Sequence, residues 1–260
     1  MEEAFNLEKN EYLKKNPQWR LPYLQALARY TDCVAGKGHV EAIPETTWVS
    51  MSLNTFPGAR PIHQRPRPLS PPDQADLDRQ LAIWLRQRVI VPAVKGAWAL
   101  NLVPVRKKGV AAGVRRWTLD ARGINNICES HPEYIGSVGS NLEELAGVDL
   151  YCQLDLSNAF LSIPIHPDHI HKASFVTPKS GSFSMTRSGY GFKNSPAALE
   201  KLGTALMRPI PTDKGNKYMD DFLLKDCDPG ELLKTLCTFL DQIRAANVKI
   251  QASKLTAQQP

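Results

Sequence analysis

Two adjacent carboxylates interrupt an aromatic and aliphatic run, Lys217-Tyr218-Met219-Asp220-Asp221-Phe222-Leu223-Leu224. The run predicts a β-hairpin, because turn-forming residues stand before it, at 215–216, and after it, at 226–230. Successive side chains on a strand point to opposite faces, so adjacent acids share a direction only at or near a turn. An Asp-Asp pair is also ordinary chemistry for a hairpin tip, and the pair alone does not distinguish a functional site from a turn.

A third acid favours a functional site. It is Asp155, which lies in a second apolar stretch, Tyr151-Cys152-Gln153-Leu154-Asp155-Leu156-Ser157-Asn158-Ala159-Phe160. Burying carboxylates beside one another is unfavourable unless a cation or a proton compensates their charge. Acids on two separate predicted strands therefore indicate a site with a compensating partner.

Four segments, in this order along the chain, resemble the motifs of reverse transcriptases from retroviruses and LTR retrotransposons. They are Arg116-Trp117-Thr118-Leu119-Asp120-Ala121-Arg122-Gly123-Ile124-Asn125, Leu154-Asp155-Leu156-Ser157-Asn158-Ala159-Phe160, Gly191-Phe192-Lys193-Asn194-Ser195-Pro196-Ala197 and Tyr218-Met219-Asp220-Asp221. One such segment would be weak evidence, whereas four in order, covering most of residues 60–258, are specific. The resemblance implies an RNA-directed DNA polymerase that transfers deoxynucleotides to a primer 3′-hydroxyl on a template.

The resemblance also implies an α+β fold: the fingers and palm of the polymerase right hand, with an antiparallel palm sheet packed on helices. The irregular alternation of predicted strands and helices favours the same class over a doubly wound parallel sheet. The expected division is an N-terminal arm (1–59), fingers (60–147) and palm (148–260), with fingers elements interleaved around 161–190. Relatives continue beyond the counterpart of Pro260 into a thumb and RNase H regions. We therefore expect a chain without a thumb that works beside those regions of a longer polyprotein.

For catalysis, the resemblance implies that Asp155 and Asp220 hold two Mg²⁺ ions, with Mn²⁺ as the alternative. Asp221 is given a supporting electrostatic role. Nucleotidyl transfer requires the 3′-hydroxyl, the α-phosphate and the leaving pyrophosphate to be held in line. Two divalent ions about 3.5–4 Å apart do this in polymerases, and Mg²⁺ binds through one or two carboxylates together with phosphate oxygens and water.

The nucleotide site implied by the resemblance draws on three segments. Its residues are Lys107, Lys108, Arg116, Asn158, Ala159, Phe160 and Tyr190. Phe160 would lie beneath the incoming sugar and exclude a 2′-hydroxyl, although an aromatic residue at a strand end more often belongs to the core. Arg116 offers a bidentate fork suited to phosphate, and either Lys107 or Lys108 supplies a second phosphate contact.

Two positions depart from the family pattern. Ser188-Gly189-Tyr190-Gly191 stands where relatives usually carry Leu-Pro-Gln-Gly, so Tyr190 replaces the glutamine that lies against the incoming nucleotide. Asn158 replaces an acid, at a position that the family uses largely through its backbone N–H. The alternative function is therefore a degenerate or domesticated nucleic-acid-binding module with little or no turnover.

The positive charge of the chain is concentrated in one block. The 260 residues carry a net charge of +6, but residues 60–122 alone contain thirteen Lys or Arg and four Asp, a net charge of +9. Such a block inside a folded domain predicts a polyanionic partner, here an RNA or DNA template with its primer, besides the nucleotide substrate. A solvated surface is the alternative explanation.

Five cysteines without paired spacing, several of them in apolar runs, predict buried thiols in a reducing compartment rather than disulfides or a zinc site. The N-terminus lacks an apolar signal-like stretch, and no apolar run approaches membrane-spanning length. We expect a cytoplasmic protein without a membrane partner, with the nucleus or a virus-like particle as alternatives. The histidines of His166-Pro167-Asp168-His169-Ile170-His171 are interpreted as a polar turn.

Apolar spacing predicts the remaining elements. Helices are expected at 18–31, from Ser70 to before 91, at 141–146, at 195–207 and at 232–246. Strands are expected at 46–54, 98–105, 114–120, up to Asp155, and at 173–177 and 183–186, with an extended segment at 57–72. Pro104 predicts that the strand at 98–105 lies at a sheet edge, since proline cannot donate a ladder hydrogen bond.

Overall fold

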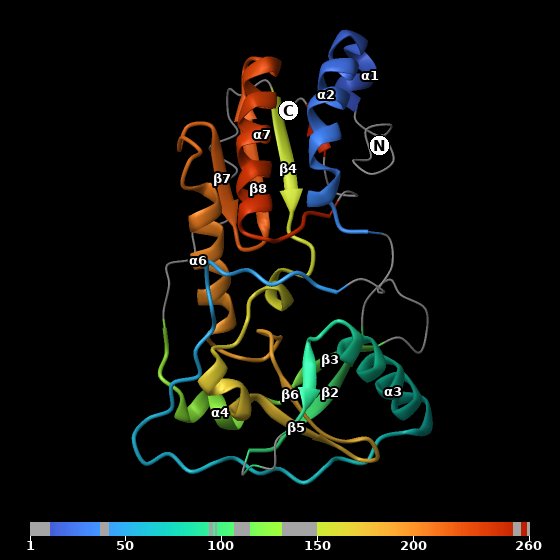
Figure 1. Ribbon diagram of the computed structural model, residues 1–260, viewed down its shortest axis with the longest axis vertical. Helices are drawn as coiled ribbons and strands as arrows, with labels where there is room; N and C mark the ends of the chain where they lie inside the picture. Colours follow the sequence, from blue (N-terminus) through green and yellow to red (C-terminus); the bar gives the residue numbers. More distant parts are fainter. Residues whose placement is uncertain are drawn as a thin grey trace.

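The computed structural model describes residues 11–36, 42–93, 96, 98–106, 115–131, 150–251 and 256–258 (Figure 1). The helical segments are α1 (Glu11–Lys15), η2 (Pro17–Trp19), α2 (Arg20–Leu27), η3 (Ala28–Cys33), α3 (Pro71–Arg86), α4 (Arg122–Ile127), η4 (Ala159–Ser162), η5 (Pro167–Ala173), α6 (Ser195–Met207) and α7 (Pro229–Ala245). The strands are β1 (Ile90–Pro92), β2 (Leu100–Arg106), β3 (Arg115–Leu119), β4 (Leu150–Asp155), β5 (Ser174–Thr177), β6 (Gly181–Met185), β7 (Gly215–Tyr218), β8 (Asp221–Asp226) and β9 (Thr256–Gln258). The helix expected at 141–146 and the residues Lys107 and Lys108 lie outside the described residues.

The described strands form two sheets. One has the order β1-β6-β5-β2-β3 and the other the order β7-β8-β4-β9. In Figure 1 the four-stranded sheet lies in the upper half beside α7 and α2, and the five-stranded sheet lies in the lower half with α3 and α4. The mixture of sheets and separately packed helices confirms the α+β class.

The four-stranded sheet is antiparallel throughout, which agrees with the antiparallel sheet that the resemblance implies. Its centre is the ladder of β4 with β8, which runs from the pair Leu150 and Asp226 to the pair Asp155 and Asp221. Helix α7 packs on these two strands, with the rings of Phe222 and Phe239 4.9 Å apart. Apolar side chains thus fix the position of the strands whose ends carry the acids.

Helix α3 begins where the sequence predicts. The Ser70 hydroxyl accepts a hydrogen bond from the Asp73 backbone N–H (3.3 Å), and Pro71 occupies the first helical position, where its missing N–H costs nothing. The spacing of Leu77, Leu81, Trp84 and Leu85, at i, i+4, i+7 and i+8, predicts one inward face, and the first three are buried. The prediction is wrong for Leu85, which is 39% exposed because it lies at the margin of the apolar face.

Two predictions about strands need correction. Strand β2 is internal, because β5 pairs with it at Leu100 and Asn101 while β3 pairs along its other side. The pairing with β5 ends before Pro104. The proline therefore has a neighbouring strand on one side only, and its missing N–H breaks no hydrogen bond on the other side. Residues 46–54 form no strand: Met51 makes a single bridge with Ile165, because the neighbouring chain is extended only between η4, which ends at Ser162, and η5, which begins at Pro167.

The segment predicted to be extended at 57–72 contains no helix up to Ser70, whereas Pro71 and Pro72 already belong to α3. Polar side chains fasten the part before α3 to the five-stranded sheet. The Asn101 amide donates to the Gln64 side chain (3.0 Å) and accepts from the Arg67 backbone N–H (3.2 Å). The Asp120 carboxylate accepts hydrogen bonds from Arg67 (2.6 Å) and from Arg122 (2.7 and 2.8 Å). This hydrogen bonding lowers the pKa of Asp120 to about 2, with Arg122 as the main cause.

The five cysteines are free thiols. Cys33, Cys128 and Cys152 are buried, as predicted, whereas Cys237 is partly buried and Cys227 is exposed. Burial raises the pKa of the Cys152 thiol to about 12. None of the described helices is both long enough and apolar enough to cross a membrane.

Candidate active site

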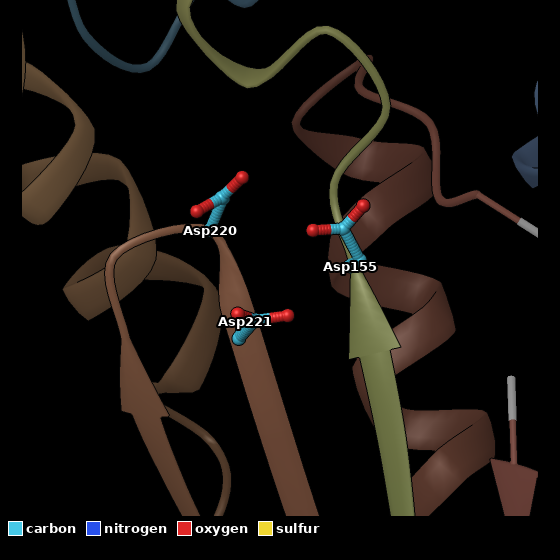
Figure 2. Close-up of side chains that lie close together, drawn as sticks. All are labelled: Asp155, Asp220 and Asp221. Atoms are coloured by element: carbon cyan, nitrogen blue, oxygen red, sulfur yellow. The ribbon is translucent and has the colours of Figure 1, made fainter. Parts of the chain in front are cut away.

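Three carboxylates converge at one end of the four-stranded sheet (Figure 2). Asp155 ends β4, Asp221 begins β8 opposite it, and Asp220 lies in the turn that precedes β8. One ligand oxygen from each carboxylate lies within 4.8 Å of the others. Within the described ranges, this is the group of at least three His, Cys, Asp or Glu side chains that could hold a metal ion.

The turn between β7 and β8 explains how neighbouring acids share one site. Tyr218 pairs with Asp221, so Met219 and Asp220 alone form the loop of the hairpin. Met219 has φ 55°, the left-handed conformation that two-residue hairpin turns require at their first central position. The Leu156 backbone N–H donates to the Asp220 carbonyl oxygen (3.1 Å), which fastens the turn to the end of β4.

The environment of the acids favours a cation. Asp155 is buried and Asp220 and Asp221 are partly exposed. Two unit charges about 5 Å apart repel by on the order of 3 kcal/mol at an effective dielectric constant of 20. Because three carboxylates share the site, a divalent cation would offset a repulsion that the fold otherwise has to overcome.

Three of the predicted nucleotide residues come together from separate segments. Phe160 lies in η4, Arg116 lies in β3, and Tyr190 lies in the loop before α6. The rings of Phe160 and Tyr190 meet edge to face, with centroids 5.2 Å apart and an interplanar angle of 65°. The Cζ atom of Arg116 lies 4.8 Å from the centroid of the Tyr190 ring. The sequence contains no signal for either ring contact.

Asn158 and Ala159 connect the acids to this cluster. Asn158 has φ 52°, a left-handed conformation that asparagine tolerates better than most residues. It turns the chain from the end of β4 into η4, where Ala159 is buried and Phe160 packs at the edge of the core. Asn158 also lines a cavity of about 220 Å³ together with Arg116 and Tyr190.

The loop that carries Tyr190 is fixed to the segment that carries Arg116. Gly191 has φ 112°, and a Cβ atom there would lie 2.5 Å from the Leu119 carbonyl oxygen. The Asn125 side chain donates to the Gly191 carbonyl oxygen (2.8 Å) and accepts from the Lys193 backbone N–H (3.0 Å). The sequence placed Gly191 and Asn125 inside two motifs but did not reveal that they hold these motifs against each other.

Two of the histidines at 166–171 accept hydrogen bonds from backbone N–H groups. His169 Nδ1 accepts a hydrogen bond from the Leu53 backbone N–H (3.1 Å), and burial lowers the pKa of this imidazole. His166 Nδ1 accepts from the Asp168 backbone N–H (3.4 Å) at the start of η5. Their contacts are those of a polar turn followed by a short helix.

Comparisons with known proteins agree with this geometry. A sequence model of the family described as "Reverse transcriptase (RNA-dependent DNA polymerase)" matches residues 105–259. The retrovirus-related Pol polyprotein from transposon 297 of Drosophila melanogaster is 25% identical over 218 residues, which cover 82% of this chain and 20% of the polyprotein. The Gag-Pol polyprotein of walleye dermal sarcoma virus is 28% identical over 189 residues, which cover 71% of this chain and 11% of the polyprotein. The chain thus spans about a fifth or less of the length of these relatives.

Solved structures share the fold. The prototype foamy virus protease-reverse transcriptase (CSH mutant) superposes with a TM-score of 0.79 at 23% identity, covering 96% of this chain and 32% of the viral chain. The foamy viral protease-reverse transcriptase in complex with an RNA/DNA hybrid superposes with a TM-score of 0.78 at 20% identity, covering 98% of this chain and 32% of the viral chain. At this identity the likeness shows the fold alone.

Proposed function

The chain belongs to the reverse transcriptase family, and from that premise we propose that it catalyses RNA-directed DNA synthesis. The reaction is the template-directed transfer of a deoxynucleotide to a primer 3′-hydroxyl. The observation that carries the proposal is the convergence of Asp155, Asp220 and Asp221 at the ends of β4 and β8.

The three carboxylates fit a pair of Mg²⁺ ions, with Mn²⁺ as the alternative. Asp155 and Asp220 would bind the ions through one oxygen each, and Asp221 would add negative charge beside them. When bound, the ions supply activation of the attacking hydroxyl and neutralisation of the charge that develops on the phosphate. The ladder between β4 and β8 fixes the separation of the acids, so the site is arranged before substrate arrives.

The nucleotide is proposed to lie against the cluster formed by Arg116, Phe160 and Tyr190. The Arg116 guanidinium donates to its phosphates, which a planar fork binds through two parallel hydrogen bonds. The Phe160 ring lies beneath the sugar and excludes a 2′-hydroxyl, and the backbone of Asn158 and Ala159 borders the same space. Lys107 or Lys108 is proposed to add a second phosphate contact.

The proposed macromolecular partner is a template with its primer. Arginines of the block at 60–122 pair with three of its four aspartates: Asp73 with Arg115, Asp76 with Arg79, and Asp120 with Arg67 and Arg122. Arg60, Arg65, Arg86, Arg88 and Arg116 remain exposed. Exposed arginines favour contact with phosphates. Two of the similar foamy viral structures are complexes, one with an RNA/DNA hybrid and one with double-stranded DNA. The other regions of a longer polyprotein are proposed as further partners.

The sheets support the division into an N-terminal arm (1–59), fingers (60–147) and palm (148–260). Strands β5 and β6 follow β4 in the chain but join the five-stranded sheet with β2 and β3. Fingers elements interleaved around 161–190 account for this crossing. The four-stranded sheet with α6 and α7 would then be the palm.

Primer extension on an RNA template with Mg²⁺ tests the proposal. Asp155→Asn and Asp220→Asn should each reduce extension to background, because one ligand charge is lost while the side chain keeps its size. Asp213→Asn is the matched control, since it removes the same charge from an exposed loop before β7. Circular dichroism and thermal unfolding establish that the variants fold. Near wild-type extension by either site variant would refute the assignment, and template-primer binding by the wild-type chain without extension would favour the nucleic-acid-binding module.

A further inference from the structure

We propose that Tyr190 determines sugar selectivity and nucleotide affinity by holding Phe160 and Arg116 in position. The inference rests on the proposed function and assigns a role to a residue that differs from the glutamine of relatives. Tyr190 is a positioning residue in this account: it acts through the two side chains that meet the sugar and the phosphates.

One aromatic ring makes both contacts. The edge-to-face geometry of Tyr190 with Phe160, at 5.2 Å and 65°, is one that aromatic pairs prefer. The guanidinium carbon of Arg116, 4.8 Å from the ring centroid, lies within the range of a cation–π interaction. Since β3 and η4 are separate elements, the ring is a physical link between the phosphate-binding side and the sugar-binding side of the site.

Arg116 depends on this ring for its position. Its neighbour Arg115 is held by an ion pair with Asp73 (3.1 Å), whereas Arg116 forms no ion pair within the described part of the chain. A long exposed side chain loses rotamer freedom when it binds a ligand, and a contact that already orders it reduces this loss. The Tyr190 ring therefore favours phosphate binding by ordering the guanidinium beforehand.

Phe160 depends on the ring in a different way. It is only partly buried, at the edge of the core, and the Tyr190 ring packs against it. An aromatic residue excludes a 2′-hydroxyl only when its ring keeps its position and is not displaced by the extra oxygen. Removing the neighbouring ring gives Phe160 room to move and so weakens the exclusion.

Contacts on both sides of Tyr190 hold its backbone in place. Gly191 packs directly on Leu119, and the Ser195 hydroxyl donates to the Gly189 carbonyl oxygen (2.9 Å). The Tyr190 side chain is 42% exposed, and its hydroxyl makes no hydrogen bond to the residues that the structure describes. The ring, rather than the hydroxyl, is therefore the part of Tyr190 that acts on its neighbours.

Single-nucleotide incorporation on a template-primer, with dNTP and with the matching rNTP, measures both effects. Tyr190→Leu should raise the KM for dNTP by about fivefold, as expected for loss of a partly exposed cation–π contact. It should also lower the preference for dNTP over rNTP by about fivefold, through loss of the aromatic pair. The kcat for dNTP should change much less, because the lost contacts act on binding. Tyr190→Phe keeps the ring and should recover both quantities. Phe56→Leu, at an exposed aromatic residue that does not line the cavity beside Tyr190, serves as the truncation control.

Double variants separate positioning from general damage. If Tyr190 acts through Arg116, Tyr190→Leu should add little to the KM of Arg116→Ala, because coupled residues are not additive. By the same logic, it should add little to the sugar selectivity of Phe160→Val. Wild-type selectivity and KM in Tyr190→Leu, or full additivity in both double variants, would overturn the inference. A wild-type chain that incorporates no nucleotide with either metal would instead refute the proposed function, and the inference would fall with it.

Discussion

The Asp120 carboxylate is the point at which a single substitution should weaken the attachment of the extended segment to the five-stranded sheet. Asp120 is buried, and its oxygens accept hydrogen bonds from Arg67 of that segment and from Arg122 at the start of α4. Asp120→Asn keeps the size of the side chain but removes the negative charge with which both guanidinium groups form ion pairs. The Arg67 bond joins residues 53 positions apart, so its loss affects tertiary structure rather than one turn.

The size of the effect follows from the pKa. A pKa of about 2 for Asp120, against 3.8 ordinarily, corresponds to about 2.5 kcal/mol of stabilisation by the ionised form. The side chains of Arg67 and Arg122 are 48% and 81% exposed, so solvent screens both interactions. We therefore expect Asp120→Asn to lower the free energy of unfolding by about 1–2 kcal/mol at neutral pH.

The pH dependence gives the sharper test. Because the folded-state pKa of Asp120 is depressed, its stabilisation is complete above the unfolded pKa near 4 and disappears as the pH falls through about 2. Urea denaturation of the wild type and Asp120→Asn should therefore differ by a constant amount from pH 5 to 7 and converge between about pH 4 and 2. Asp213→Asn, at an exposed acid, controls for the change in net charge. Equal stability at pH 7, or a difference that persists unchanged at the lowest pH, would refute the electrostatic explanation.

Three further predictions concern the site and its partner. Gly191→Ala should destabilise the protein by about 1–3 kcal/mol or more, because a side chain is disfavoured at φ 112° and the new Cβ would clash with the Leu119 carbonyl oxygen. It should also raise the KM for nucleotide; unfolding and incorporation assays measure the two effects. Phe160→Val should increase the ratio of ribonucleotide to deoxyribonucleotide incorporation, and an unchanged single-turnover ratio would leave Phe160 as a packing residue. Affinity for template-primer should fall steeply with salt concentration, since phosphate contacts release counterions, and a flat salt titration would exclude the block at 60–122 as the binding surface.

Elements with strong local signals could be predicted from the sequence. Helix α6 spans the predicted residues, because Ser195-Pro196 starts it and apolar spacing continues to Met207. Helix α7 begins earlier than predicted, at Pro229 rather than Leu232. The composition of Asp228-Pro229-Gly230 predicts part of a turn, yet the Asp228 carboxylate accepts a hydrogen bond from the Glu231 backbone N–H (2.8 Å) and caps the helix.

Elements that depend on distant partners could not be predicted in the same way. The alternation at 46–54 correctly indicated that Met51 and Leu53 are buried. A strand also needs a neighbour that presents a continuous ladder, and the chain beside this segment offers one bridge, between Ile165 and Met51. The location of Pro104 has the same explanation. The point at which the pairing with β5 ends, and not the proline itself, decides where β2 lacks a second neighbouring strand.

In the candidate site, too, features with a local sequence signal could be predicted and contacts between distant residues could not. Local patterns could place Asp155 on a strand and the Asp220-Asp221 pair at a hairpin turn, and the antiparallel register then brings Asp155 opposite Asp221. The contacts of Tyr190 have no such local signal, because Arg116 is 74 positions away and every side chain involved has an ordinary explanation when considered alone. Compared with relatives, tyrosine in place of glutamine looks like the loss of a nucleotide contact. In the folded chain its ring packs on the two side chains proposed to meet the sugar and the phosphates, so the same substitution introduces a support that glutamine, without a ring, would not provide.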